Sequence, residues 1–196
     1  MAFPMTRLWM VRHGPTHREG LIGWTDAPAD LSNKVSIDRL NAHLPQNAVV
    51  ISSSLIRCVA TADAIQSART RLPHDPNLRE LHFGDWEDRT FADVSKTDPA
   101  LSMAYWSDPG PHAPPNGESW DTAQARISCS VDRLVADHSG KDIIIVAHFG
   151  AILTQLQRAT KMPAKSALAF KIDNLSVTLI EHIGSAWRVL GVNHKP

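Results

Sequence analysis

Short apolar runs alternate with longer stretches of mixed apolar and polar residues along most of the chain. Three runs are rich in apolar or β-branched side chains, which favours buried β-strands: residues 6–11, 48–51 and 143–147. Four longer stretches are predicted to be helices: residues 31–44, 55–68, 119–138 and 151–160. In the second and third of these, apolar side chains recur every three or four positions, and a serine is expected to cap the start of the second. Two further strands, residues 175–183 and 187–192, are expected to form a hairpin around Gly184 and Ser185.

This alternation of strands and helices predicts an α/β fold. We expect a three-layer sandwich with a mostly parallel central sheet and helices on both of its faces. Residues 73–115 do not follow this alternation. They are rich in Pro, Asp and Trp and are predicted to contain only short helical pieces, near 91–96 and 100–106. We interpret them as a small cap insertion over one edge of the sheet. The whole chain, residues 1–196, is expected to form a single α/β domain that includes this cap.

The charged residues balance, with 20 Lys and Arg against 20 Asp and Glu, so the formal net charge is zero. Such a chain lacks the electrostatic footprint of a nucleic-acid binder, and no apolar run approaches the ~18–20 residues of a membrane span. Residues 1–7 do not combine a basic region with an apolar stretch, so no signal peptide is expected. Cys58 and Cys129 are expected to be reduced thiols of a cytoplasmic protein. We therefore expect no nucleic-acid or membrane partner, and the sequence leaves the oligomeric state open.

Three polar clusters come directly after predicted strands: residues 12–14, 52–57 and 147–150. Because ligands of such folds bind where the carboxyl ends of the strands meet, we expect two arginines and two histidines to converge there. Arginine offers a charged planar fork that bonds phosphate oxygens, and a neutral imidazole is a good nucleophile near pH 7. A glycine after the first histidine lets the backbone approach an anion closely. The pattern therefore favours a phosphate site.

Six short motifs follow one another along the chain: Leu-Trp-Met-Val-Arg-His-Gly-Pro-Thr at 8–16, Ile-Gly-Trp-Thr-Asp at 22–26 with Leu-Ser at 31–32, Ser-Ser-Leu-x-Arg-x-x-x-Thr-Ala at 53–62, Leu-Arg-Glu-Leu-x-Phe-Gly-Asp-Trp-Glu at 78–87, Asn-Gly-Glu-Ser at 116–119, and Ile-Val-Ala-His-x-Gly at 145–150. In this order and spacing they resemble the motifs of the histidine phosphatase superfamily, also called phosphoglycerate-mutase-like. The resemblance covers nearly the whole chain. A single Arg-His-Gly would be a weak signal, whereas six motifs in order are specific.

The resemblance implies a role for each of five candidate catalytic residues. His13 would become phosphorylated, while Arg12 and Arg57 would hold the phosphoryl oxygens. His148 would complete the pocket, and Glu80 would act as the proton donor. These roles agree with the chemistry, because a transferring phosphoryl group is stabilised mainly by positioned charges and the leaving alkoxide needs a proton.

Other residues of the same motifs concern the substrate. Gly23 is expected to be a substrate-binding residue. At three positions the chain departs from the family pattern: Glu19 stands where many relatives have Asn, Pro15 replaces an acidic residue or Gln, and Phe149 replaces a small residue. These differences leave the phosphate centre intact and affect the identity of the substrate.

Some polar and aromatic residues near the motifs are expected to be structural. Glu118 and Ser119 are predicted to cap the helix that follows them. Trp24, Trp86 and Trp106 are predicted to pack beneath the cap rather than to bind a ligand.

The residues and the resemblance together predict a metal-independent phosphomonoesterase that hydrolyses a small phosphorylated metabolite through a phosphohistidine at His13. Its expected partners are that substrate and inorganic phosphate, with no metal and no cofactor. Phosphoglycerate mutase-type phosphoryl transfer is the main alternative, although it requires the phosphoenzyme to be shielded from water and the cap is modest. A phosphohistidine phosphatase acting on proteins would need an open mouth, whereas residues 73–115 resemble a cover. A non-catalytic phosphate-binding module is the remaining alternative, and the joint presence of the five candidate residues disfavours it.

Overall fold

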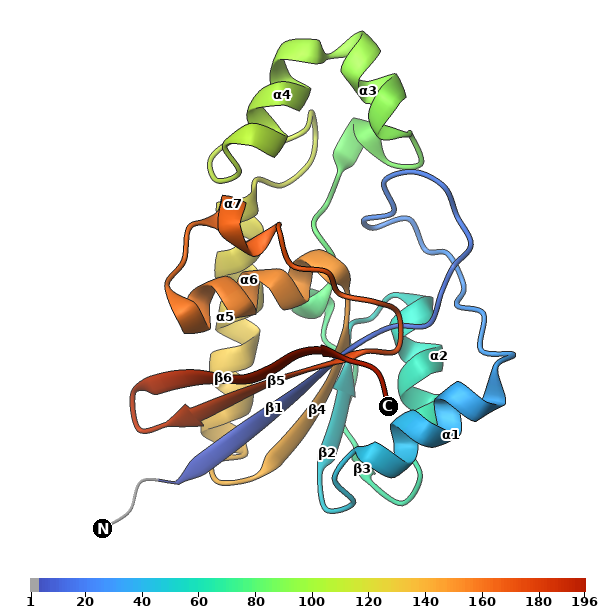
Figure 1. Ribbon diagram of the computed structural model, residues 1–196, viewed down its shortest axis with the longest axis vertical. Helices are drawn as coiled ribbons and strands as arrows, with labels where there is room; N and C mark the ends of the chain where they lie inside the picture. Colours follow the sequence, from blue (N-terminus) through green and yellow to red (C-terminus); the bar gives the residue numbers. More distant parts are fainter. Residues whose placement is uncertain (1–3) are drawn as a thin grey trace.

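One six-stranded sheet forms the centre of the structure, a computed structural model that describes residues 4–196 (Figure 1). The strand order is β3-β2-β4-β1-β5-β6, and the bounds are β1 Met5–Arg12, β2 Val49–Ser52, β3 Thr70–Arg71, β4 Asp142–Ala147, β5 Val177–Ile183 and β6 Ala186–His194. The β3-β2-β4-β1 part is parallel throughout, whereas β5 is antiparallel to β1 and β6 is antiparallel to β5. The predictions of a mostly parallel sheet and of a terminal hairpin are therefore confirmed. Residues 1–3, part of the segment in which no signal peptide is expected, lie outside the described residues.

Helices cover both faces of the sheet, as the alternation of elements predicts. Their bounds are α1 Lys34–His43, α2 Ile56–Ile65, α5 Trp120–Asp137, α6 Phe149–Thr160 and α7 Ala164–Ala167. Along β4, Ile143 and Ile145 pack into one core with α5 and α6. The alternate residues Ile144 and Val146 pack into a second core with α1 and α2. This is why β4 is apolar at nearly every position, since a strand buried on both faces has no solvent side.

The start of α2 corrects one prediction about local structure. The helix begins after Leu55, and no side chain caps it, although a serine was expected to do so. Both nearby serine hydroxyls have other partners: Ser53 Oγ lies 2.8 Å from His148 Nε2, and Ser54 Oγ accepts a bond from Arg79 Nε at 2.8 Å. Long-range contacts therefore displaced the local cap.

Other helix boundaries shift by two or three residues. α1 begins at Lys34 rather than at residue 31, because Asn33 is its cap and accepts a bond from the Ser36 amide. α6 begins at Phe149, two residues earlier than expected. The cap of α5 agrees with the prediction for Ser119, whose hydroxyl accepts from the Thr122 amide at 3.1 Å.

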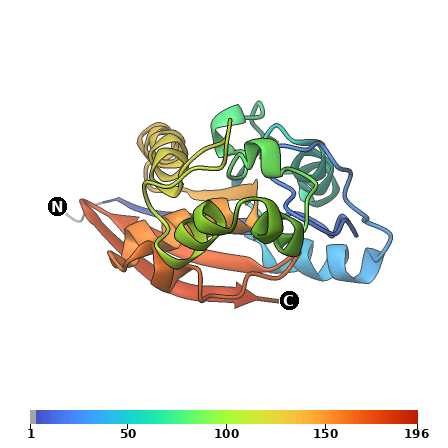
Figure 2. The same cartoon turned by 90° about the horizontal axis from the view of Figure 1, so that it is seen from above.

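The segment between β3 and α5 lies above the carboxyl edge of the sheet. It contains η1 (Pro76–Leu78), η2 (Gly84–Trp86), α3 (Phe91–Thr97) and α4 (Pro99–Ser107). Figure 2, which looks down on this edge, shows α3 and α4 in front of the sheet. Trp86 is fully buried beneath these helices, where its ring meets that of Tyr105 edge to face at 5.5 Å. Neither β3 nor α7 was predicted, since elements of two and four residues are too short to show a period.

In residues 4–196 no helix is long and apolar enough to span a membrane.

Candidate active site

The register of the central strands brings the polar clusters together. β1 and β4 pair so that Arg12 lies opposite Ala147, which places the next residues, His13 and His148, side by side. Their ring centroids are 5.1 Å apart. Arg57 enters from the first turn of α2, which follows the neighbouring parallel strand β2. The structure therefore gathers at one edge of the sheet the residues that the sequence predicts there.

His13 is held as a neutral imidazole with one nitrogen left as an acceptor. Its Nδ1 lies 2.7 Å from the carbonyl oxygen of Gly14, which can only accept, so Nδ1 carries the proton. Nε2 is then the basic nitrogen, and the Arg57 Nε–H donates to it at 3.2 Å. Burial and the nearby Arg57 charge lower the pKa of His13 to about 3. At neutral pH the ring therefore presents an unprotonated nitrogen.

Arg57 stands between the two histidines and is almost fully buried. Its Nε–H donates to His13 Nε2 and to His148 Nδ1, both at 3.2 Å. Its two terminal nitrogens donate to the backbone carbonyls of Thr25 at 2.8 Å and Gly23 at 2.6 Å. Three sides of the guanidinium are thus tied, which fixes the charge in place beside the basic nitrogen of His13.

His148 lies behind Arg57 and is completely buried. Because its Nδ1 accepts from Arg57, its Nε2 carries the proton and donates to Ser53 Oγ at 2.8 Å. The Cys58 sulfur packs against the ring, 3.3 Å from Nε2. Burial, with a smaller contribution from Arg57, lowers the pKa of His148 well below its usual value. The second histidine is therefore also neutral.

Glu80 is a buried carboxyl group at the N-terminus of α6. Its oxygens accept bonds from the backbone amides of Gly150 and Ala151, each at 3.0 Å, and from that of Leu81 at 3.1 Å. Burial raises the pKa of Glu80, while these amide bonds and the two guanidinium groups act in the opposite direction. The group is therefore fixed in position, and its pKa lies above that of an ordinary glutamate.

A clamp that the sequence analysis missed holds the backbone of Glu80. Arg126 of α5 donates to the Glu80 carbonyl at 3.0 Å and to that of Asn77 at 2.8 Å. Glu118 binds the same guanidinium at 2.8 and 2.7 Å, and Trp24 Nε1 donates to the Glu80 carbonyl at 2.8 Å. Glu118 therefore anchors this clamp, in place of the predicted helix-capping role. Arg126 belongs to none of the six motifs. The sequence shows it only as a charged residue on a half-buried helix, which does not indicate a role in the site.

Gly23 is placed where its backbone supports Arg57. Its carbonyl accepts from Arg57, and its amide donates to Glu87 Oε2 at 3.1 Å. A side chain at this position would collide with Glu87 and with the Leu81 carbonyl. Glu87, a motif carboxylate without an assigned role in the sequence analysis, also accepts from the amides of Trp24 and Thr25. It shapes the loop that holds Arg57.

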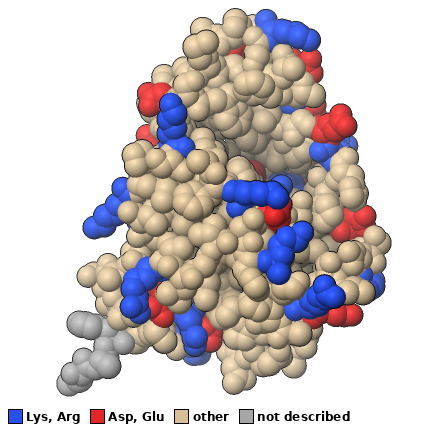
Figure 3. All heavy atoms as spheres, in the orientation of Figure 1, with Lys and Arg blue, Asp and Glu red and all other residues tan. Residues whose placement is uncertain are grey.

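The central cavity, about 270 Å³, opens in front of these groups. It is lined by Arg12, His13, Thr16, Arg18, Gly20, Leu21, Ile22, Arg57, Glu80, Phe83, Trp106 and Phe149. Figure 3 shows the surface hollowed between the part that carries α3 and α4 and the body below, with blue Lys and Arg side chains at the lower rim. The lining includes the guanidinium groups of Arg12 and Arg57, the imidazole of His13 and the Glu80 carboxyl group. The arrangement can bind an oxyanion against His13 and exchange a proton with Glu80.

Arg12 forms the second cationic wall of the central cavity. Its Nη1 donates to the Ile172 carbonyl at 2.6 Å, and its guanidinium lies 5.6 Å from the Phe149 ring centroid. Its Nε is buried and has no partner among the described residues. Burial lowers the pKa of Arg12, although an arginine remains charged at neutral pH. Phe149, one of the departures from the family pattern, therefore packs on Arg12, a candidate phosphate-binding side chain.

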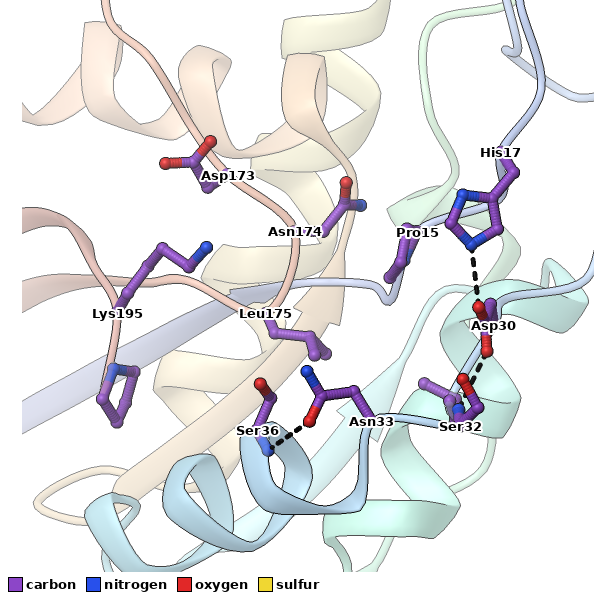
Figure 4. A pocket seen from close by; sticks show the side chains of 12 residues that line it. Pro15, His17, Asp30, Ser32, Asn33, Ser36, Asp173, Asn174, Leu175 and Lys195 are labelled. Carbon is purple, nitrogen blue, oxygen red and sulfur yellow. Dashed lines mark hydrogen bonds and ion pairs between the residues drawn. The ribbon is translucent and has the colours of Figure 1, made fainter.

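A larger pocket of about 410 Å³ lies between the loop after β1, the start of α1 and the segment before β5 (Figure 4). His17 Nε2 and Asp30 Oδ2 are hydrogen-bonded at 2.8 Å on one wall. Asn174 on the opposite wall donates to the His13 carbonyl at 2.8 Å. None of the five candidate catalytic side chains lines this pocket. Its contact with the site is the hydrogen bond from Asn174 to the His13 carbonyl.

The fold and the site define a phosphoryl-handling α/β enzyme, and comparison with known proteins names the class. The model of the histidine phosphatase superfamily (branch 1) matches residues 8–195, so the chain belongs to this family. An adenosylcobalamin/alpha-ribazole phosphatase of Escherichia coli (strain K12) is 30% identical, over 96% of this chain and 91% of that protein.

Solved structures agree with this assignment. Bacillus stearothermophilus YhfR superposes with a TM-score of 0.87 at 28% identity, covering 96% of each chain. A mycobacterial glucosyl-3-phosphoglycerate phosphatase in complex with inorganic phosphate superposes with a TM-score of 0.80 at 28% identity, over 96% of this chain and 97% of that chain. With its family established and relatives named as phosphatases, the chain is a phosphoric monoester hydrolase.

Proposed function

We propose that this chain hydrolyses small phosphomonoesters without a metal ion, through a phosphohistidine at His13. The observation that carries the proposal is the fixed tautomer of His13. Its Nδ1–H is bound to the Gly14 carbonyl, and its basic Nε2 meets the Arg57 guanidinium in the central cavity. Arg12 and Arg57 supply the positive charge that a transferring phosphoryl group requires.

The reaction proceeds in two half-reactions. His13 Nε2 attacks phosphorus as the ester P–O bond breaks, and Glu80 gives its proton to the departing oxygen. Water then attacks the phosphohistidine, the P–N bond breaks, and the Glu80 carboxylate takes a proton from that water. Inorganic phosphate leaves, and both residues return to their starting states. The raised pKa of Glu80 suits the first step, in which the carboxyl must hold a proton.

Several features support a small substrate and a hydrolase rather than a mutase. The cavity of about 270 Å³ is below the ~300–1,000 Å³ range of sites for drug-sized ligands, so it suits a small molecule. The cap helices α3 and α4 have only seven and nine residues, which is little material for shielding a phosphoenzyme from water. Relatives named as alpha-ribazole phosphatases make alpha-ribazole 5'-phosphate the first metabolite to assay.

We also propose a cytoplasmic location. Its support is that Cys58 and Cys129 are both free thiols rather than partners in a disulfide.

Trapping the intermediate tests the mechanism. The enzyme, with a chelator present, is mixed with a ³²P-labelled phosphomonoester and quenched in base, where phosphohistidine is stable. We expect label on the peptide that contains His13, and we expect His13→Ala to lose both label and turnover. His17→Ala is the matched control, because His17 lies outside the central cavity and faces Asp30. Turnover at the normal rate by His13→Ala would contradict the proposal, as would turnover that stops when the chelator is added.

The same labelled enzyme distinguishes hydrolysis from transfer. When a phosphoglycerate acceptor is added, a phosphatase releases labelled inorganic phosphate, whereas a mutase passes the label to the acceptor. We expect release of phosphate. Complete transfer to the acceptor would make the mutase the correct assignment.

A further inference from the structure

The segment just before β5 contacts the two consecutive residues at the end of β1. Asn174 Nδ2 donates to the backbone carbonyl of His13 at 2.8 Å. The Leu175 amide donates to the Arg12 carbonyl at 2.9 Å, and the Ile172 carbonyl accepts from the Arg12 side chain at 2.6 Å. This one segment therefore holds both Arg12 and His13, although it lies about 160 residues further along the chain.

The backbone of Leu175 indicates that these contacts determine the path of the segment. Its φ of 59° lies in the left-handed region, which a bulky side chain rarely adopts. Such a residue persists where the surrounding contacts fix it. Here the Leu175 amide is bound to Arg12, and the Asp173 amide donates to the side chain of Asn193 in β6 at 2.6 Å. The segment that carries Asn174 is therefore held at both of its ends.

Thr61 of α2 binds the other side of the peptide group that joins His13 to Gly14. The Gly14 amide donates to Thr61 Oγ1 at 3.0 Å, and the Thr61 hydroxyl donates to the Arg57 carbonyl, one helical turn earlier, at 2.7 Å. Thr61 is fully buried and belongs to the motif at 53–62, in which the sequence analysis assigns it no role. The peptide group is therefore bound at its carbonyl by Asn174 and at its amide by Thr61.

We propose that Asn174 and Thr61 are positioning residues that fix the tautomer of His13. The inference rests on the proposed function, in which His13 Nε2 attacks phosphorus. The proton stays on Nδ1 while the Gly14 carbonyl lies 2.7 Å from that nitrogen, and the direction of this carbonyl depends on the peptide group before it. If that peptide group turns, the ring can hold its proton on Nε2, which then has no lone pair for phosphorus. Neither positioning side chain lines the central cavity, so both act through the backbone.

Thr61→Val and Asn174→Ala each remove one of the two hydrogen bonds. Thr61→Val keeps the shape of the side chain and loses its hydroxyl, whereas Asn174→Ala leaves the His13 carbonyl without its donor. We expect kcat/KM to fall about tenfold in each variant, equally on an alkyl and an aryl phosphate, because one nucleophile serves both substrates. The conservative variant Thr61→Ser keeps the hydroxyl and is expected to retain most of the kcat/KM. Asn47→Ala is the matched control, because Asn47 is exposed in the turn before β2.

Two measurements distinguish a positioning role from a merely structural one. In enzyme labelled with ¹⁵N-histidine, the NMR shifts of the two ring nitrogens report which of them carries the proton, and His13→Ala identifies the His13 signals by their loss. We expect a protonated Nδ1 and an unprotonated Nε2 in the unaltered enzyme, and shifts that move toward each other in Thr61→Val and Asn174→Ala. Inhibition by inorganic phosphate is expected to stay within about threefold, because an Nε2–H also donates to a phosphate oxygen and both arginines remain.

The outcomes separate this inference from the proposed function. His13 signals that are the same in both variants as in the unaltered enzyme would overturn the inference, and so would a normal kcat/KM in both variants. Phosphate inhibition that weakens in parallel with kcat/KM would show a distorted site and would also overturn it. Failure of the proposed function would instead show as an unaltered enzyme that takes up no ³²P label on His13, whatever tautomer its ¹⁵N signals report.

Discussion

Gly150→Ala is the substitution that best tests how the fold positions Glu80. A Cβ built on Gly150 would lie 2.6 Å from Glu80 Oε1 and would also collide with the end of the Leu81 side chain. An ordinary carbon–oxygen contact is about 3.3 Å or more, so the carboxylate must retreat by roughly 0.7 Å. Both obstructing groups are the ends of flexible side chains, so the helix can form. The change therefore moves the proposed proton donor while the fold is kept.

The size of the effect follows from the contacts that are lost. Glu80 accepts bonds from the Gly150 and Ala151 amides at 3.0 Å, and both are strained when the carboxylate moves. A misplacement near 1 Å can cost on the order of 10²-fold in rate. Removing a general acid altogether costs about 10²–10⁴-fold. We therefore expect kcat/KM on an alkyl phosphate to fall by about 10²-fold. Overpacking of this kind costs about 1–3 kcal/mol of stability, so Tm is expected to fall by several degrees only.

The assay compares an alkyl phosphate with an aryl phosphate by kcat/KM, which reports the steps up to phosphorylation of the enzyme. An aryl leaving group needs little protonation, so its loss is expected to be much smaller than that of the alkyl compound. Gly191→Ala is the control, because nothing lies within 4 Å of a Cβ at Gly191. If Gly150 acts through Glu80, adding Gly150→Ala to Glu80→Gln should cost little more. Equal losses on both substrates, or additive losses in the double variant, would refute the reasoning.

Two further predictions concern the anion pocket and the pH dependence. Arg57→Lys keeps the charge but loses the fork that joins the two histidines to the Gly23 and Thr25 carbonyls, so kcat/KM should fall about 10- to 100-fold and vanadate inhibition should weaken. Arg7→Lys is the control, because Arg7 pairs with Asp142 and does not line the central cavity. If Arg57→Lys kept the normal kcat/KM and the normal inhibition by vanadate, the proposed anion pocket would be contradicted. Because the pKa of His13 is lowered to about 3, kcat/KM on alkyl phosphates should show no His13 limb between pH 5 and 7. Because the pKa of Glu80 is raised, the fall in kcat/KM as Glu80 loses its proton should lie at higher pH than for an ordinary glutamate. Glu80→Gln should remove that basic limb, and its persistence in this variant would assign it to another group.

The sequence by itself determined the fold class and the residues that meet at the sheet edge. Alternating strands and helices require parallel strands with crossovers, so polar clusters that follow those strands converge whatever the details of packing. Arg12, His13, Arg57 and His148 were predictable for this reason. The long apolar run that forms β4 also identified a strand buried on both faces.

Only the tertiary structure decided which partners hold the candidate catalytic groups. Glu80 and Gly150 are 70 residues apart, and Arg126 reaches the Glu80 carbonyl across 46 residues. Likewise, Ser53 contacts His148 instead of capping α2. Hydrophobic periodicity arises from neighbouring positions along one element, whereas the partner of a buried polar group depends on which distant element packs against it.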